Sequence, residues 1–445
     1  MKRIYTVLTS AVLGLLLIFG VVALFSPSSS AQKPKLTFSA LLNGSFYSDY
    51  RTYYSAGFSD NKTLKSTNTA LNGFYRYSGL SGDDVSIIVN MNGGAANGGE
   101  ALKPTAPATE KPSDTDPAAT TEAPSEQPTQ PTERVDNHNV VAEDLGQALI
   151  VGDRALEVPH ANYDVMESYG DAVTNIATAL GKDVRTFNVL VPNGAEFYAP
   201  NDYHTGDMSQ SKMIGFCYEK LGSNVKTADA YAKLAAHTDE YIYFRTDHHW
   251  TQLGAYYAYT AFCEAAGFDA PPLSKFEQGQ YDNFLGSMYT FLSGYPQAAV
   301  LANNPDTLYY YRPYVDTDTG YYEDATLTTE IPMGCISYIG SDVSNKYLTF
   351  LGGDHPVTII NTDVEGPVCM IIKESYGNAF TPWLTSHYSK IIAIDPREFN
   401  RDGHPSLDLA SFAKEQGVDD CIILNYPMMI SSEAYVEWLN RLVNQ

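Results

Sequence analysis

The chain has 445 residues, 44% of them hydrophobic, which is enough for a large core and for either two domains or one large domain with insertions. Its formal net charge is −24, from 28 basic and 52 acidic residues, and the acidic excess is spread along the sequence. This balance argues against nucleic acid or an anionic lipid surface as a partner of the body of the protein, because both would be repelled.

The amino terminus has a membrane-directed pattern. Lys2 and Arg3 precede an uncharged run over residues 4–25, which as a helix is long enough to cross a hydrocarbon core of about 30 Å. The positive flank should stay in the cytoplasm, so the rest of the chain is expected outside it. A cleavable signal peptide is the alternative, with small residues at positions 29–31, although the apolar run exceeds the usual core of roughly 7–15 residues. We therefore expect residues 1–31 to anchor the protein in the membrane or, if they are cleaved, to direct its secretion.

A low-complexity stretch follows. Residues 93–137 consist of Gly, Ala, Pro, Thr, Ser and Glu with almost no large apolar side chain, so they cannot bury enough surface to offset the entropy of ordering and are expected to be disordered. Residues 32–92, which include a strand-like run at 86–89, are too short to hold a core alone and are expected to pack on the main domain. Residues 93–137 could link an anchor-proximal module to the main domain. We instead favour an insert within one domain, whose main part spans residues 138–445, because the preceding part is so short.

From residue 138 onward, apolar runs typical of buried parallel strands alternate with segments of helical periodicity, which predicts an α/β fold. The expected strands are residues 148–151, 185–191, a short one from 225, 240–245, 367–373, 390–395 and 420–425. The expected helices are residues 164–180, 213–221, 229–236, 252–267, 378–386, 407–416 and 432–443. Residues 276–361 are rich in Tyr, Thr, Gly and Pro and predict a β-rich insertion, with strands at 307–312 and 347–350.

The five cysteines lack metal-ligand spacing and mostly stand in apolar surroundings, so we expect small core residues and predict no disulfide. They are Cys217, Cys263, Cys335, Cys369 and Cys421.

Two groups of reactive side chains stand at predicted strand-to-helix junctions. Asp247 and His249 follow the expected strand 240–245, and Ser375 follows the buried strand 367–373. The carboxyl ends of strands in one sheet meet at one edge, where such folds place their ligands. A lone serine before a helix is more often an N-cap, but a serine nucleophile needs a base, and the base needs a carboxylate that fixes its tautomer. The sequence thus predicts a triad of Asp247, His249 and Ser375.

The neighbouring side chains have less distinctive roles. His248 either supports the triad from beside it or faces away from His249, and we expect the second because adjacent strand residues point to opposite faces. Trp250 is expected to pack in the core. A zinc site formed by Asp247, His248 and His249 is the chemical alternative. Adjacent histidines rarely converge on one ion without a distant third ligand, which favours the triad.

The run Thr246-Asp247-His248-His249-Trp250-Thr251 resembles the signature of the DHHW family of exported bacterial proteins. It is also similar to the Thr-Asp-x-His-Trp motif of SGNH-hydrolase-like domains in alginate O-acetylation proteins. The resemblance covers most of residues 139–445 and implies an SGNH-hydrolase-like, flavodoxin-like three-layer fold with a parallel sheet and a β-rich insertion. It also implies the triad of Asp247, His249 and Ser375. Glu374 departs from the family pattern, in which Asp usually precedes the serine.

These features together predict an extracytoplasmic serine acyl esterase or O-acetyltransferase that acts on a cell-surface polysaccharide. The backbone amide of Ser375, with the side chain of Asn378 or Asn193, is the expected oxyanion donor. No cofactor motif is present, so in a transfer reaction an acyl-donating membrane protein would have to supply the acyl group.

The alternative function is that of a non-catalytic, membrane-tethered glycan-binding protein that uses the tyrosine-rich residues 309–322 as its contact surface. The same tyrosines are also typical of an aromatic edge of a small sheet. The distance between His249 and Ser375 separates the two functions, because catalysis requires hydrogen-bond reach.

Overall fold

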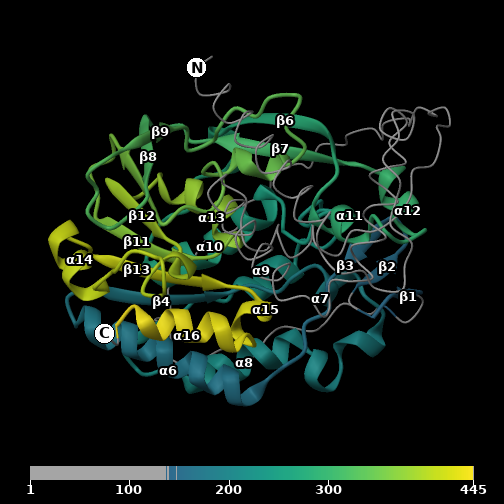
Figure 1. Ribbon diagram of the computed structural model, residues 1–445, viewed down its shortest axis with the longest axis horizontal. Coiled ribbons are helices and arrows are strands. Elements are labelled where there is room, and N and C mark those ends of the chain that lie inside the picture. Colours follow the sequence, from purple (N-terminus) through teal and green to yellow (C-terminus); the bar gives the residue numbers. More distant parts are fainter. Residues whose placement is uncertain (1–136, 138–139, 147, 444–445) are drawn as a thin grey trace, which may run out of the picture. The chain divides into compact units, whose positions relative to one another are not determined.

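The structure of the chain, a computed structural model, describes residues 137, 140–146 and 148–443 (Figure 1). All of them belong to one of two units into which the chain divides, Ile87–Gln445. The predicted anchor at 1–31, the segment 32–92 and nearly all of the predicted insert at 93–137 lie outside the described residues, so these predictions stay untested. Among the helices that are described, none combines the length and the apolar character needed to cross a bilayer.

A mixed eight-stranded sheet forms the centre of the fold (Figure 1). Its strands from β5 to β12 are parallel, whereas β10, β8 and β9 are each antiparallel to the strand before them in the sheet. The order is β5 (Val225–Thr227), β4 (Arg185–Leu190), β13 (Asp420–Asn425), β11 (Val368–Lys373), β12 (Lys390–Ile394), β10 (Val357–Thr362), β8 (Thr317–Tyr322) and β9 (Ile331–Met333). The central strands are buried on both faces, which explains their continuous apolar runs.

Helices cover both faces of the sheet and give three layers (Figure 1). One layer holds α6 (Tyr163–Leu180), α8 (Gln210–Lys220), α14 (Leu409–Gln416) and α16 (Glu433–Arg441). The other holds α9 (Ala230–Ala235), α10 (Gln252–Ala266) and α13 (Tyr376–Leu384). The predicted three-layer α/β fold is confirmed, and α13 begins at Tyr376 rather than at residue 378.

The predicted strand at residues 240–245 is wrong. These residues are irregular, with bends, and instead of a strand of the sheet they contribute only Tyr243, which forms an isolated bridge with Trp250. Ile242, Tyr243 and Phe244 are nonetheless buried, so their apolar run reflects the core around a folded-back loop. Burial on all sides gives a loop and a central strand the same sequence pattern.

The β-rich insertion at residues 276–361 is confirmed, and part of it belongs to the central sheet. Its strands β8, β9 and β10 extend the central sheet, which is therefore mixed rather than purely parallel. Its other strands, β6 (Glu277–Phe284) and β7 (Asp306–Arg312), pair with each other, and α11 (Ser287–Leu292) and α12 (Ala298–Ala302) lie between them in sequence. The strand expected at 307–312 is confirmed as β7 and forms the expected aromatic edge of a small sheet, whereas the strand expected at 347–350 is instead the 3-10 helix η5 (Lys346–Thr349).

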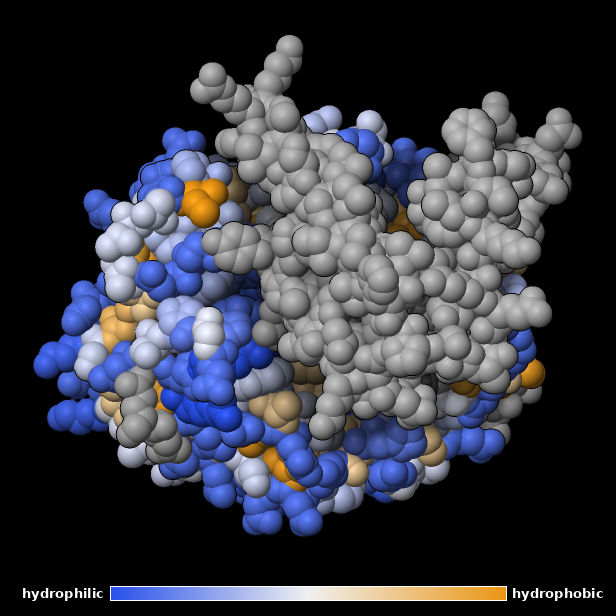
Figure 2. Space-filling view, in the orientation of Figure 1, coloured by the Kyte–Doolittle hydropathy of each residue, from blue (hydrophilic) through white to orange (hydrophobic). Residues whose placement is uncertain are grey.

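The remaining elements are small. The strand predicted at 148–151 is confirmed, but it belongs to a separate antiparallel sheet of β1 (Glu143–Asp144), β2 (Leu149–Val151) and β3 (Arg154–Leu156). The short helices α7 (Ala195–Tyr198) and α15 (Pro427–Ile430) follow β4 and β13. All five cysteines are free and buried. The described surface seen in Figure 2 is mainly hydrophilic, with scattered apolar patches.

Candidate active site

The segment that carries the predicted base is a hairpin-like loop leading into α10. The N–H of Phe244 donates to the carbonyl of His249 (3.3 Å), and the N–H of Thr251 donates to the carbonyl of Ile242 (2.9 Å). The loop lies against the first turn of α10, where a Cβ on Gly254 would stand 2.4 Å from the Ile242 carbonyl oxygen. The Thr251 hydroxyl caps that helix by accepting the Gly254 N–H. The residues at the tip of the loop are therefore held on a rigid base.

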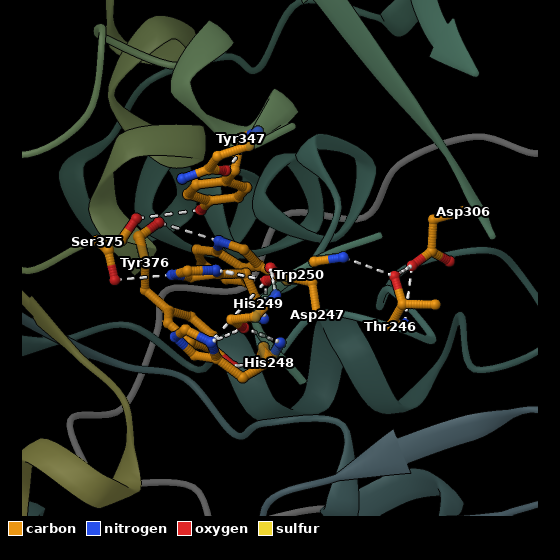
Figure 3. Close-up of polar contacts among 12 residues, drawn as sticks. Thr246, Asp247, His248, His249, Trp250, Asp306, Tyr347, Ser375 and Tyr376 are labelled. Carbon is orange, nitrogen blue, oxygen red and sulfur yellow. Dashed lines mark hydrogen bonds and ion pairs between the residues drawn. The ribbon is translucent and has the colours of Figure 1, made fainter. Parts of the chain in front are cut away.

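A buried aspartate from the insertion holds the tip of this loop. The Asp306 carboxylate accepts the N–H (2.8 Å) and hydroxyl (2.6 Å) of Thr246 and the N–H of Arg245 (3.0 Å). Figure 3 shows the contact between Asp306 and Thr246. Tyr241 also donates its hydroxyl to the Asp306 carboxylate. Asp306 is completely buried. It was not predicted, because an aspartate after Asn303-Asn304-Pro305 is typical of an ordinary turn before a strand.

The loop brings Asp247 and His249 to Ser375 in a continuous chain of hydrogen bonds (Figure 3). His249 Nδ1 lies 2.6 Å from Asp247 Oδ1, and His249 Nε2 lies 2.7 Å from Ser375 Oγ. Asp247 and His249 are 5% and 6% exposed, so water screens this pair weakly. The structure thus brings the three predicted triad residues together, although Ser375 is far from Asp247 and His249 in sequence.

Asp247 is held by more than the imidazole. Its Oδ1 also accepts the His249 N–H (2.9 Å), and its Oδ2 accepts the N–H of Ser287 (2.8 Å) from the insertion. Burial favours the neutral acid, but the charge and the hydrogen bond of His249 outweigh it and lower the pKa of Asp247 below its ordinary value. Gly286 leaves room for this carboxylate, because a Cβ there would stand 2.3 Å from Asp247 Oδ2.

Ser375 stands at the N-terminus of α13, directly after β11, but its hydroxyl makes no capping hydrogen bond. Its backbone is helical, with φ −57° and ψ −26°, whereas a capping serine usually has extended geometry. The carboxylate of Glu374 accepts the Tyr376 N–H instead (2.9 Å). The hydroxyl of Ser375 therefore remains available for His249.

Glu374, the residue that departs from the family pattern, is buried beside this serine. One of its oxygens lies 3.4 Å from Ser375 Oγ. Burial raises the pKa of Glu374 to about 8, against the lowering effects of the Tyr376 N–H and of Arg397. Near neutral pH the residue next to the serine is therefore largely an uncharged acid.

His248 does not face away from His249, so that prediction is wrong. The two ring centroids are 3.8 Å apart with an interplanar angle of 37°, and His248 Nδ1 lies 2.5 Å from Ser287 Oγ. The alternation of side chains applies to strands, and this segment is a loop. His248 is therefore a direct neighbour of the triad.

Trp250 packs in the core, as predicted. It is completely buried, its indole N–H donates to the carbonyl of Tyr376 (3.0 Å), and its ring lies nearly parallel to that of Phe380. It fixes the loop against the first turn of α13.

Tyr347 is a further neighbour of the triad that the sequence did not reveal. Its ring stacks on the imidazole of His249, with centroids 4.0 Å apart and planes at 11°, and its hydroxyl donates to the carbonyl of Ser375 (3.1 Å). An apolar pattern around Tyr347 predicted a strand, and nothing in that pattern indicates which tyrosine of a tyrosine-rich insertion returns to the site.

The two predicted oxyanion side chains are engaged elsewhere in the hydrogen bonds that the structure describes. Asn378 accepts from Lys373 Nζ (2.5 Å) and donates to Asp354 (2.8 Å). Asn193 donates to the carbonyl of Glu157 (2.9 Å). Their role as oxyanion donors stays a prediction.

The zinc alternative has some geometric basis, because Asp247, His248 and His249 offer ligand atoms within 4.8 Å of one another. Both ring nitrogens of His249, however, lie within hydrogen-bond distance of triad partners. A metal ion would have to displace one of these partners, so the arrangement favours the triad.

The sequence and the fold were compared with known proteins. A family model described as DHHW protein matches residues 128–394. A DHHW family protein from Eubacterium siraeum has 30% sequence identity and a TM-score of 0.60, over 69% of this chain and 99% of that chain. Bacillus cereus PatB1, solved with a sulfonyl adduct, has 17% identity and a TM-score of 0.53, over 66% of this chain and 99% of that chain.

A more distant match is the O-acetyltransferase domain of Pseudomonas putida AlgJ, with 16% identity and a TM-score of 0.37, over 68% of this chain and 98% of that chain. No curated protein matches the sequence. The family model covers more than half of the chain, and the match to the protein from Eubacterium siraeum spans nearly all of that protein. The chain therefore belongs to the DHHW family.

Proposed function

We propose that this protein is a serine acyl esterase or O-acetyltransferase that works outside the cytoplasm on a cell-surface polysaccharide. The observation that carries the proposal is the bridging position of His249, within hydrogen-bond distance of Asp247 on one nitrogen and of Ser375 on the other. This is the geometry that nucleophilic acyl transfer requires.

In the acylation step, Ser375 Oγ attacks the carbonyl carbon of an ester, and His249 Nε2 takes the hydroxyl proton. Asp247, which stays ionised, accepts a hydrogen bond from Nδ1–H and thereby leaves Nε2 as the basic nitrogen. The carbon–oxygen bond to the leaving alcohol then breaks, and His249 returns its proton to that alcohol. The acyl group remains on Ser375 as an ester.

The negative oxygen that forms during this step needs donors near Ser375. The Ser375 N–H lies at the N-terminus of α13, where the helix dipole favours negative charge. We assign the oxyanion to this N–H, with Asn378 or Asn193 as the predicted second donor.

The second step decides between the two activities. In an esterase, His249 removes a proton from water, which attacks the acyl-serine; the bond between the acyl carbon and Ser375 Oγ then breaks, and His249 returns the proton to Oγ as the acid leaves. In an O-acetyltransferase, a sugar hydroxyl takes the place of water, and an acyl-donating membrane protein supplies the first ester. Both versions share the acyl-Ser375 intermediate.

The substrate class and the location rest on sequence. The resemblance to alginate O-acetylation proteins supports a polysaccharide substrate, and the charged and apolar pattern of residues 1–31 supports a body outside the cytoplasm. The membrane is then a partner through that segment.

The decisive experiment is covalent labelling of the purified protein with a sulfonyl fluoride, followed by intact mass and peptide mapping. We expect one adduct on Ser375 and hydrolysis of 4-nitrophenyl acetate that the label abolishes. Ser375→Ala should lose both, with activity at least about 10⁴-fold lower. Ser411→Ala, which removes an exposed hydroxyl near the start of α14, should behave like the original protein.

Two outcomes would contradict the proposal. Full hydrolysis by Ser375→Ala would exclude the serine mechanism. Binding of O-acetylated polysaccharide without labelling or turnover would instead support the glycan-binding alternative. Acetyl release into water, compared with acetyl transfer to an added oligosaccharide, then separates the esterase from the transferase.

A further inference from the structure

Tyr347 touches both halves of the triad from a third part of the chain. It stands in η5, between β9 and β10, whereas His249 belongs to the loop before α10 and Ser375 to the turn after β11. The side chain is 4% exposed, and its ring meets that of Phe350 edge-on at 5.1 Å. The N–H of Tyr347 donates to Asn345 Oδ1 (3.1 Å), so the first turn of η5 is capped. The ring is therefore held in place independently of the triad.

The ring lies over the plane of the imidazole. The centroid distance of 4.0 Å and the angle of 11° place His249 on the π face of Tyr347, and Figure 3 shows His248 on the other side of His249. A π face attracts a cation and does not attract a neutral ring to the same degree. During acylation His249 becomes a cation, so the contact strengthens as the reaction proceeds.

The hydroxyl of the same residue reaches the nucleophile. It donates to the carbonyl oxygen of Ser375 at 3.1 Å, and burial raises the pKa of Tyr347, so the phenol keeps the proton that it donates. The carbonyl belongs to the first turn of α13, and its position fixes the turn that presents the serine hydroxyl. One side chain thus sets the distance between base and nucleophile.

We propose that Tyr347 is a positioning residue that holds His249 and the Ser375 turn in register and stabilises the imidazolium formed during acylation. The catalytic role that this inference gives to Tyr347 rests on the proposed function. Its electrostatic part concerns the imidazole alone and can be measured without turnover.

The groups around His249 that carry or acquire charge come from several elements. Asp247 and His248 belong to its own loop, Glu374 precedes the serine, and Tyr376 faces it from α13 at 5.2 Å with an angle of 48°. Tyr376 is tilted, whereas Tyr347 lies nearly parallel to the imidazole. Tyr347→Phe keeps the ring and Tyr347→Leu removes it, so the difference between these two variants reports the effect of the stacked ring.

The experiment compares Tyr347→Phe, which keeps the ring and loses the hydroxyl, with Tyr347→Leu, which loses both. The pH at which His249 takes up a proton is followed by NMR in protein with ¹³C-labelled histidine, with His249→Gln used for assignment. We expect this pH to fall by about half a unit or more in Tyr347→Leu and to stay unchanged in Tyr347→Phe. Tyr388→Phe, which removes the hydroxyl that donates to Asp420 at the far end of the sheet, is the control for removing a buried hydroxyl.

The rate of sulfonyl fluoride labelling is measured on the same proteins. We expect a loss of a few-fold in Tyr347→Phe, of at least tenfold in Tyr347→Leu, and none in Tyr388→Phe. The inference is overturned if Tyr347→Leu leaves the protonation of His249 unmoved while the protein remains folded. Absence of labelling in the unmodified protein would refute the proposed function instead and would leave the NMR result to decide the electrostatic part.

Discussion

The nucleophile and the acid–base pair of the candidate active site are built in different ways. Ser375 stands on a regular strand-to-helix turn between β11 and α13, inside the repeating α/β architecture. Asp247 and His249 stand on an irregular loop with no place in the sheet, and residues of the β-rich insertion hold it: Asp306, Gly286, Ser287 and Tyr347. The comparison teaches that the insertion is part of the candidate active site, since its residues hold the loop that carries His249.

The largest effect is expected from Asp306→Asn. The substitution places an NH₂ group where the carboxylate accepts hydrogen bonds from Arg245 and Thr246, so buried donors face each other or lose their partner. We expect the free energy of unfolding to fall by about 3 kcal/mol and labelling of Ser375 to slow by about 100-fold. Chemical denaturation and labelling kinetics measure the two effects.

Asp363→Asn provides the control, because this exposed carboxylate accepts a single N–H, from Asp316. It should leave both quantities unchanged. If the Asp306→Asn protein is labelled at the normal rate, the loop holds its shape without this contact, which would contradict a role of the insertion in placing His249.

A smaller effect is expected from Gly286→Ala. The added Cβ would stand 2.3 Å from both Cβ and Oδ2 of Asp247, so the carboxylate must move away from His249. We expect labelling to slow by roughly ten- to 100-fold, with a stability loss of about 1–3 kcal/mol from overpacking. Gly215→Ala in α8, where a Cβ would meet nothing within 4 Å, should be neutral or slightly stabilising. Equal labelling by the two variants would mean that the insertion does not position Asp247.

The last effect concerns the serine side and depends on pH. The pKa of Glu374 is raised from 4.5 to about 8 by burial, so the folded protein holds a proton there that the unfolded chain releases above about pH 4.5. Stability is therefore lost as pH rises towards 8, by at most about 1.4 kcal/mol per pH unit from this group. Glu374→Gln should flatten this part of the curve, whereas Glu415→Gln on the exposed face of α14 should not.

Other titrating groups do not produce the same signature. The pKa of Asp247 lies below its ordinary value, so this residue is ionised in both states above about pH 5. Burial lowers the pKa of His355 to about 4, which makes stability rise with pH between about 4 and 6.5 in original and variant alike. The difference between the original protein and Glu374→Gln thus isolates Glu374, and parallel curves would show that its proton plays no part.

The sequence predicted the serine side well and the histidine side only in part, for a physical reason. Strands such as β11 and helices such as α6 have local periodicity that reports their burial, so their positions and the Ser375 turn follow from short windows. Asp247 and His249 could also be predicted as triad residues from their chemistry. The shape of their loop was not, because its hydrogen bonds end on Asp306 and on the backbone of β3, which are remote in sequence.

The contacts of individual side chains could not be predicted from the sequence for the same reason. Tyr347 and Glu374 acquire their roles from neighbours that only the folded chain supplies, and His248 was misplaced because a strand was assumed. The three triad residues could be chosen from their chemistry alone, whereas the residues that support them could be identified only from the tertiary structure.

The separation of His249 and Ser375 by 126 positions also bears on when the candidate active site forms during folding. Contacts between remote segments form late, because the entropy of closing the intervening chain must first be overcome. Asp306 and Ser287 of the intervening insertion hold the loop of His249, so we expect the site to form only after the insertion has folded. We therefore expect a chain in which the loop of His249 has not yet docked to leave Ser375 unlabelled.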